Sequence, residues 1–293
     1  FEDDFRPDDR FLMERFITAN IEVTGAIDSS TENTDKGYGL LTQARCRKLS
    51  DQTRQFDLQM LSVDIECSMK GELYSIGAYA QNVSIVFMIG IPNPEESTSS
   101  EFDIHWVEDE AALLKAFIVW MNHNDPDIII GWNVINFDMD LLQKRCDLNN
   151  IDFTIGRDGS VPYWRKNSNS GQKFIEIAGR VVLDGIDLLK TATYSFPSFS
   201  LDYVSKELLG LGKKVDDVDN RVSEITHNFL HNKLALAKYN LEDCRLVWLI
   251  FEKTLLLSFA QLRAQLTGLE IDRVGGSVAA FTNLYLPKLH RSQ

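Results

Sequence analysis

The stretch Leu61-Ser62-Val63-Asp64-Ile65-Glu66 is a mainly apolar run that ends in two carboxylates separated by one isoleucine. Such a run is typical of a β-strand, and side chains two residues apart on a strand project from the same face. We therefore expect Asp64 and Glu66 on one face of a sheet, and Val63 and Ile65 on the other. Taken alone, the pair is more simply explained as a strand end that meets solvent, so its meaning depends on partners elsewhere in the chain.

The composition is that of an ordinary globular protein, with 44% hydrophobic residues in a chain of 293. This length is enough for one large or two modest domains. The 43 acidic and 30 basic residues give a net charge of -13, which argues against nucleic-acid binding by diffuse attraction to phosphates. Contact with nucleic acid would have to be local or assisted by metal ions.

The cysteine and hydropathy patterns restrict the class of protein further. The four cysteines have no C-x-x-C spacing and no histidines arranged for a zinc site, which favours a reducing compartment. No apolar run reaches the ~18 residues of a membrane span, and we expect no membrane partner. The chain begins at Phe1 without an initiator methionine, and we expect it to be cut from a longer protein.

Strand and helix patterns alternate through the middle of the chain. They predict an antiparallel meander followed by alternating helices and buried strands, which is an α/β sandwich with a mixed sheet. The expected strands lie at about 59–66, 73–78, 83–89, 128–130 and 181–183, and the expected helices at 108–121, 138–146 and 201–209. Residues 90–100 are expected to form a turn, and residues 151–173 a hairpin or an exposed excursion.

Residues 1 to about 56 have a different pattern, with little core of their own. A short helical run near Arg10–Phe16 is followed by a polar stretch from Ser29 to Lys36 that is expected to be a loop.

The helix pattern from Leu234 to Leu255 is the most informative in the chain. Apolar residues recur at spacings of three and four, and a second apolar face carries Tyr239 and Asp243. A helix with two apolar faces is packed on both, so Asp243 is expected in a buried surface. There an unpaired carboxylate costs several kcal/mol, and Asp243 needs a cation or a proton.

Four acids are therefore candidates for one site: Asp64, Glu66, Asp138 at the start of the second helix, and Asp243. Four carboxylates in a dry pocket cannot all ionise without counter-charge, and such oxygen ligands suit Mg²⁺ or Mn²⁺. Two divalent ions about 3.5–4 Å apart are the usual means of in-line displacement at a phosphodiester. Tyr239 lies one helical turn before Asp243, and a phenol with a pKa near ~10 suits the positioning of water better than general-base catalysis.

Three segments carry a resemblance to a known family. Ser62-Val63-Asp64-Ile65-Glu66, Asn133-Val134-Ile135-Asn136-Phe137-Asp138 and Tyr239-Asn240-Leu241-Glu242-Asp243 resemble, in this order, the three motifs of the four-acid (DEDD) 3′→5′ exonucleases of the tyrosine subtype. Residues 125–133 are similar to the segment that leads into the second motif in family B DNA polymerases. Residues 11–18 and 273–281 look like one bacterial subfamily of these polymerases, so the resemblance covers nearly the whole chain.

The resemblance implies a ribonuclease H-like mixed β-sheet flanked by helices, with a partial N-terminal β-rich segment. It assigns residues 1–56 to part of the polymerase's N-terminal domain and residues 57–272 to the 3′→5′ exonuclease domain. Residues 273–293 then begin the connection to a polymerase domain that this chain lacks.

The same resemblance implies that the four acids bind two Mg²⁺ or Mn²⁺ ions and that Tyr239 orients the attacking water. Lys238 does not fit the histidine subtype, and an isolated helix tyrosine would more simply be a packing aromatic. The implied activity is proofreading: hydrolysis of the 3′-terminal phosphodiester of single-stranded or frayed DNA, with release of nucleoside 5′-monophosphates. The implied partners are the rest of the polymerase chain and, through it, a sliding clamp, in the bacterial cytoplasm at the nucleoid.

Three residues are further substrate candidates, each with a simpler alternative. Asn133 could contact a phosphate or brace Asp138, or it could cap the turn before the helix. Phe137 is expected to pack and could also touch the terminal base. Phe199, with its aromatic neighbours Tyr194 and Phe196, could stack on an unpaired strand end or belong to the core.

Asp184 is expected to cap a helix rather than support the metal site. The basic residues of the excursion, which are Arg165, Lys166 and Lys173, could hold the DNA backbone or could be an exposed, solvated loop.

Two other functions share these residues. One is a free-standing 3′→5′ exoribonuclease that uses the same acids. The other is a nucleic-acid-binding domain with a vestigial nuclease site, against which the complete set of acids argues.

Overall fold

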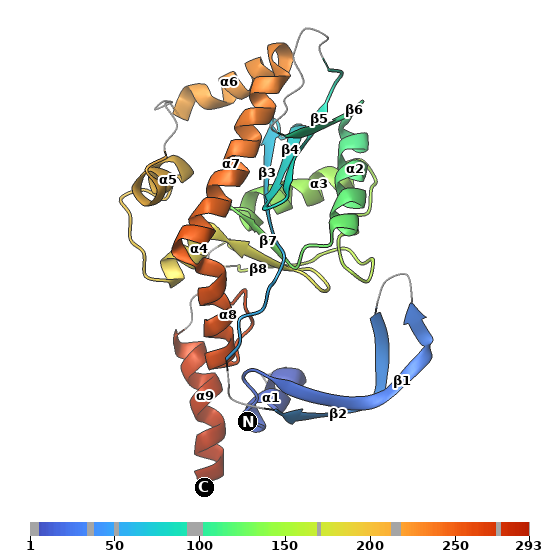
Figure 1. Ribbon diagram of the computed structural model, residues 1–293, viewed down its shortest axis with the longest axis vertical. Coiled ribbons are helices and arrows are strands. Elements are labelled where there is room, and N and C mark those ends of the chain that lie inside the picture. Colours follow the sequence, from blue (N-terminus) through green and yellow to red (C-terminus); the bar gives the residue numbers. More distant parts are fainter. Residues whose placement is uncertain are drawn as a thin grey trace. The chain divides into compact units, whose positions relative to one another are not determined.

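The computed structural model describes residues 6–33, 38–49, 53–92, 102–168, 171–211, 218–273 and 277–292. The chain divides into two compact units, one formed by Leu58–Leu255 and the other by Phe1–Asp57 with Leu256–Gln293. In the larger unit, helices lie on both sides of a central sheet (Figure 1).

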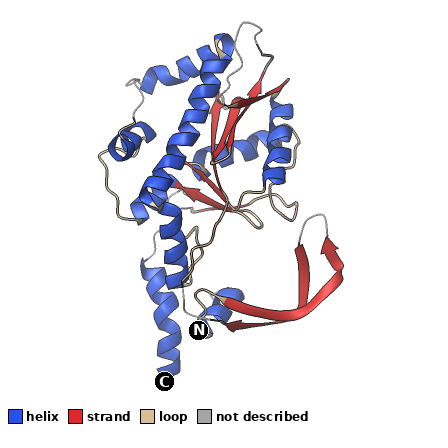
Figure 2. Ribbon diagram, in the orientation of Figure 1, coloured by secondary structure: helices blue, strands red, loops and turns tan. Residues whose placement is uncertain are grey.

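A six-stranded mixed sheet, drawn in red in Figure 2, forms the centre of the larger unit. Its strand order is β10-β7-β3-β4-β5-β6. Its strands are β3 (Met60–Cys67), β4 (Leu73–Ala80), β5 (Val83–Ile89), β6 (Asp103–Val107), β7 (Ile128–Gly131) and β10 (Val181–Asp184). β3, β4 and β5 form the expected antiparallel meander, whereas β7 pairs in parallel with both β3 and β10. This mixed α/β architecture confirms the predicted fold class.

Helices cover both faces of this sheet, because each face contributes a different set of apolar side chains. Phe87 of β5 packs in one cluster with helix α2 (Glu110–Asn124) and helix α3 (Asp140–Leu148). Its strand neighbours Val86 and Met88 pack in another cluster with helix α7 (Lys233–Thr254). The alternation of side chains along a strand thus places α2 and α7 on opposite faces, as Figure 1 shows.

Gly77 of β4 allows α7 to lie close to the sheet. A Cβ atom at this position would be 3.0 Å from the Cγ of Asn240 and 3.0 Å from the Sγ of Cys244, both on α7. A larger residue would therefore have to move the helix away from the strand.

Several local predictions are corrected by the structure. Residues 29–33, expected as a loop, belong to strand β1 (Ile21–Asn33), which pairs with β2 (Tyr38–Lys48) in a two-stranded ribbon. Residues 34–36 of that expected loop lie outside the described part of the chain. Pairing at both ends of this polar segment, Asp28 with Leu40 and Asn33 with Tyr38, keeps it in the ribbon despite its low strand propensity. The expected turn at 90–100 falls largely outside the described residues, and the edge strand β6 that follows it has no counterpart among the predictions.

The second predicted helix also differs from the structure. Asp138 lies in a single π-helical turn, η1 (Ile135–Met139), and α3 begins only after it. The expected hairpin is present as β8 (Tyr163–Lys166) paired with β9 (Lys173–Glu176).

The remaining helices of the larger unit are α4 (Gly185–Thr191), α5 (Leu201–Leu209), which ends at Gly210 as predicted, and α6 (Val218–His231). The smaller unit contains α1 (Pro7–Glu14), α8 (Leu256–Thr267) and α9 (Ser277–Ser292) besides its ribbon. Among the described helices, none has the length and hydropathy that a membrane crossing requires.

A buried arginine ties the loop before β7 to the core. The Arg180 side chain is 1% exposed and lies 2.7 Å from Asp125 Oδ1. It also donates hydrogen bonds to the carbonyl oxygens of Ile155 and Pro126. These contacts hold the loop before β7 in place.

We expect Arg180→Ala to lower the free energy of unfolding by about 1–3 kcal/mol, because the carbonyl oxygens of Ile155 and Pro126 lose a buried donor. Asp125 contributes little to this loss, since its carboxylate is 53% exposed and keeps its ion pair with Arg157. The control is Arg165→Ala, whose ion pair with Glu176 is 47% and 44% exposed and should contribute at most ~1 kcal/mol. Urea denaturation of both variants measures the difference, and equal losses would contradict the assignment.

Candidate active site

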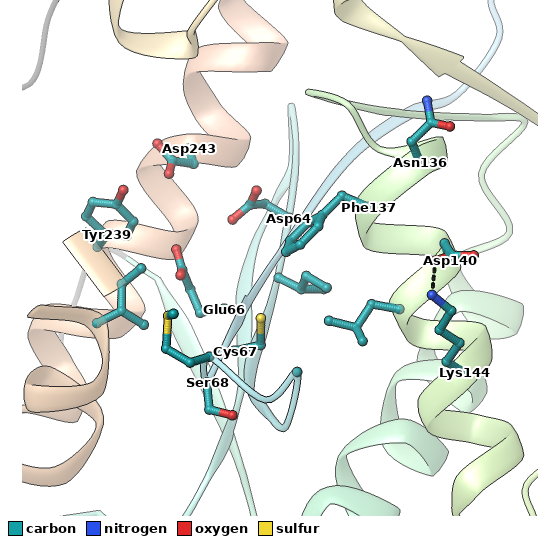
Figure 3. Close-up of a pocket in the computed structure, with 15 residues that line it drawn as sticks. Asp64, Glu66, Cys67, Ser68, Asn136, Phe137, Asp140, Lys144, Tyr239 and Asp243 are labelled. Atoms are coloured by element: carbon teal, nitrogen blue, oxygen red, sulfur yellow. Dashed lines mark ion pairs between the residues drawn. The ribbon is translucent and has the colours of Figure 1, made fainter. Parts of the chain in front are cut away.

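Three carboxylates meet in a pocket beside β3 and α7 (Figure 3). Asp64 and Glu66 come from β3 and Asp243 from α7, and each offers an oxygen atom within 4.8 Å of the other two. Val63 and Ile65 are buried in the core on the opposite face of the sheet. The predicted alternation along β3 is therefore present, and the long helix brings its buried acid to the same place.

Asp138 lies beside this cluster rather than within it. Its side chain is buried, and its Oδ1 accepts a hydrogen bond from the backbone N–H of Ile65 at 3.2 Å. This donor lies on β3 between Asp64 and Glu66. Among the described residues, three of the four predicted acids thus form one cluster, and the fourth is attached to the strand that carries two of them.

Burial and repulsion perturb the acids strongly. Burial is the main reason why the pKa of Asp64 lies well above its usual range, and the charges of Asp138, Asp243 and Glu66 raise it further. Burial also raises the pKa of Asp138 to about 8. These carboxylates need protons or a cation to be stable, and hard oxygen donors of this kind fit Mg²⁺ or Mn²⁺.

The pocket encloses about 550 Å³ and has two sides. On one side Tyr239 lies on α7, one turn before Asp243, and lines the pocket together with it. On the other side are Asn136, Phe137 and the α3 residue Lys144, whose ammonium group lies 2.6 Å from Asp140. Figure 3 shows Tyr239 and Phe137 on opposite sides of the acids.

Phe137 does not pack in the core, because its side chain is 47% exposed and lines the pocket. The packing interpretation of Phe137 is therefore wrong, and its ring is accessible to a ligand.

The other two substrate candidates are not among the residues that line this pocket. Asn133 has a φ of 61°, and its carbonyl oxygen accepts a hydrogen bond from the N–H of Phe137 at 3.0 Å. This geometry favours the turn-forming alternative for Asn133. The Phe199 ring packs edge-on against Phe196 at 5.4 Å, and its carbonyl oxygen accepts from Trp132 Nε1.

Asp184 caps α4, as predicted: its Oδ1 accepts hydrogen bonds from the N–H groups of Ile186 and Asp187. Two of the basic candidates on the hairpin form ion pairs, Arg165 with Glu176 and Lys173 with Asp140.

One residue of the site had no place among the predictions. Asn240 is fully buried, and its Nδ2 donates a hydrogen bond to Asp64 Oδ2 at 2.7 Å. The signal in the sequence is its position next to Tyr239 on a helix with two apolar faces, where a buried amide needs partners.

Comparisons with known proteins agree with this geometry. The family model for the exonuclease domain of family B DNA polymerases matches residues 2–204, and the chain therefore belongs to this family. DNA polymerase II of Escherichia coli (strain K12) is 42% identical over 293 residues, which are all of this chain and 36% of that protein. A DNA polymerase of Thermococcus hydrothermalis is 30% identical over 66% of this chain and 11% of its own length.

The chain thus spans 36% of its bacterial relative and a smaller share of the Thermococcus protein. As a family B exonuclease domain it is a 3′→5′ exonuclease, which is a hydrolase that acts on DNA. Its similarity to a bacterial DNA polymerase II confirms the expected subfamily. The exoribonuclease and vestigial-domain alternatives are not favoured.

The raised pKa of Asp138 predicts how the metal-free protein responds to pH. Between the ordinary pKa of an aspartate, about 3.9, and the folded value of about 8, the folded state binds more protons than the unfolded state. Stability therefore falls as pH rises through this window. We expect the melting temperature in EDTA to drop from pH 5 to pH 8, and Asp138→Asn to flatten this slope.

The matched control is Asp147→Asn, which changes an exposed carboxylate on α3 and should leave the slope unchanged. If Asp138→Asn keeps the full wild-type slope, Asp138 is not protonated in the folded protein as described.

Proposed function

We propose that the chain is the proofreading module of a family B DNA polymerase resembling DNA polymerase II. In this proposal it hydrolyses the 3′-terminal phosphodiester of a DNA strand with two divalent ions and releases nucleoside 5′-monophosphates. The main support is the group of Asp64, Glu66 and Asp243, whose oxygen atoms lie within 4.8 Å of one another in an open pocket.

The proposed metal ligands are Asp64, Glu66, Asp138 and Asp243, and the ions are Mg²⁺ or Mn²⁺. When bound, such ions lower the pKa of the attacking water and neutralise charge on the leaving oxygen. The acids in turn lose their mutual repulsion, which explains why the chain tolerates them in a buried position. Tyr239 would donate or accept a hydrogen bond that orients the water.

The strand end would enter the pocket with its terminal base against Phe137, because bases stack on aromatic rings with little regard to sequence. Lys144 lines the same pocket and is suited to a phosphate contact. Asn133 and Phe199 would contact the strand, if at all, outside this pocket. A mismatched end unpairs more easily than a matched one and would therefore reach the acids more often.

The division into residues 1–56, 57–272 and 273–293 stays a proposal about the parent polymerase. The basic groove for duplex DNA would belong to the rest of that protein, which accords with the net charge of -13 in this chain. Contact with a sliding clamp would also be made there, and the parent would work at the nucleoid in the bacterial cytoplasm.

Asp64→Ala is expected to abolish digestion of single-stranded DNA, with a loss of about 10³-fold or more, because a missing metal ligand removes several kcal/mol of transition-state stabilisation. The metal-free variant should be at least as stable as the wild type, since carboxylate repulsion is relieved. The assay follows release of nucleoside 5′-monophosphates with Mg²⁺, and Asp147→Ala serves as the control.

Full activity of Asp64→Ala would refute the metal assignment. A wild-type protein that binds no Mn²⁺ and digests nothing would support a vestigial domain. A strong preference for a matched RNA oligonucleotide would support the exoribonuclease.

Tyr239→Phe keeps the ring and removes the hydroxyl group. If that group orients the water, kcat should fall by about 10²-fold, because misplaced reactants lose that much rate, while KM for single-stranded DNA stays unchanged. If Tyr239 only packs, Tyr239→Phe should have a nearly normal kcat, because the ring is retained.

A further inference from the structure

Two side-chain hydrogen bonds connect the sheet to Asp64. The Oγ of Ser75 on β4 donates to Asn240 Oδ1 at 3.0 Å, and Asn240 Nδ2 donates to Asp64 Oδ2 at 2.7 Å. Ser75 and Asn240 are both 0% exposed. The three residues come from three different elements, β4, α7 and β3, so the connection exists only when all three are packed together.

Strand pairing explains why these groups meet. In the antiparallel register Glu66 pairs with Ser75 and Asp64 with Gly77. Paired residues lie on the same face of a sheet, so both acids, the serine and the glycine all face α7. Gly77 leaves room for the helix directly opposite Asp64, and Asn240 occupies that room.

The two partners determine which way the Asn240 amide points. With Asp64 ionised, as metal binding requires, its carboxylate only accepts hydrogen bonds, so the NH₂ group faces Asp64 and the amide oxygen accepts from Ser75. A reversed amide would place two acceptors against each other beside Asp64. A Cβ atom at Gly77 would be 3.0 Å from Cγ and Oδ1 of Asn240, so the amide packs closely against β4.

We propose that Asn240 is a positioning residue that orients the Asp64 carboxylate for metal binding, and that Ser75 orients Asn240 in turn. The hydrogen bond from Asn240 holds one carboxylate oxygen of Asp64. The protein thereby fixes the direction of the other oxygen before a metal ion binds. Partners that orient a ligating carboxylate typically contribute about 10–100-fold to metal affinity. This inference rests on the metal-dependent function proposed above.

The test is the affinity of the full chain for Mn²⁺, measured by titration calorimetry without DNA. Asn240→Leu keeps the approximate volume and removes the donor, and affinity should fall by about 10–100-fold. Ser75→Ala keeps the Asn240 donor but removes the hydrogen bond that holds the Asn240 amide oxygen. The loss of Mn²⁺ affinity should therefore be smaller, about threefold. Added to Asn240→Leu, Ser75→Ala should have no further effect, because the connection is already broken.

Asn232→Ala is the matched control, since Asn232 caps the same helix by accepting from the N–H of Ala235. It should weaken α7 and leave Mn²⁺ affinity unchanged. A similar loss of affinity in Asn232→Ala would reduce the role of Asn240 to helix stability and overturn the inference.

The remaining outcomes separate the inference from the proposed function. Unchanged Mn²⁺ affinity in Asn240→Leu would overturn the positioning role, with the nuclease assignment intact. Additive losses for Ser75→Ala and Asn240→Leu would overturn the connection between them. If Asn240→Leu does not fold, wild-type affinity in Ser75→Ala overturns the role of Ser75. Absence of Mn²⁺ binding by the wild type would instead overturn the proposed function.

Discussion

The mutual repulsion of buried carboxylates is the constraint on which the larger unit depends. Asp64 and Glu66 on β3 lie near Asp243 on α7 because α7 packs through apolar contacts against β4 and β5 of the same sheet. Repulsion of this kind is tolerated only when burial elsewhere stabilises the fold and when protons or a cation neutralise the carboxylates. Burial is the main cause of the raised pKa values of Asp64 and Asp138, and the charges of neighbouring acids raise them further.

Protein donors hold two of the four acids of the site, Asp138 and Asp64. The backbone N–H of Ile65 binds Asp138, and the amide of Asn240 binds Asp64. One donor belongs to the strand itself and the other to the helix that covers it. The same contacts that build the fold therefore also orient the site.

The sequence predicted what depends on local periodicity. Alternation on β3 identified the face of Asp64, and the two apolar faces of α7 identified Asp243 as buried. Features that depend on distant pairing or on very short runs escaped. The polar residues 29–33 belong to strand β1, which pairs with β2. Strand β6 was missed although Asp103, Ile104, His105 and Trp106 alternate between polar and apolar, because the run is only five residues long. The π-helical turn at Asp138 leaves no periodic signal, and Asn240 becomes significant only once Ser75 and Asp64 are known to flank it.

The pairing of β3 restricts where a residue can be inserted into the chain. Met60, Leu61 and Ser62 pair with Ile128, Ile129 and Ile130, while Asp64 pairs with Gly77. One residue inserted into β3 ahead of Asp64 would turn both acids toward α2 and expose Val63 and Ile65 to α7. The register of a single strand thus decides whether the two acids face α7, so β3 tolerates an inserted residue only beyond its paired segment.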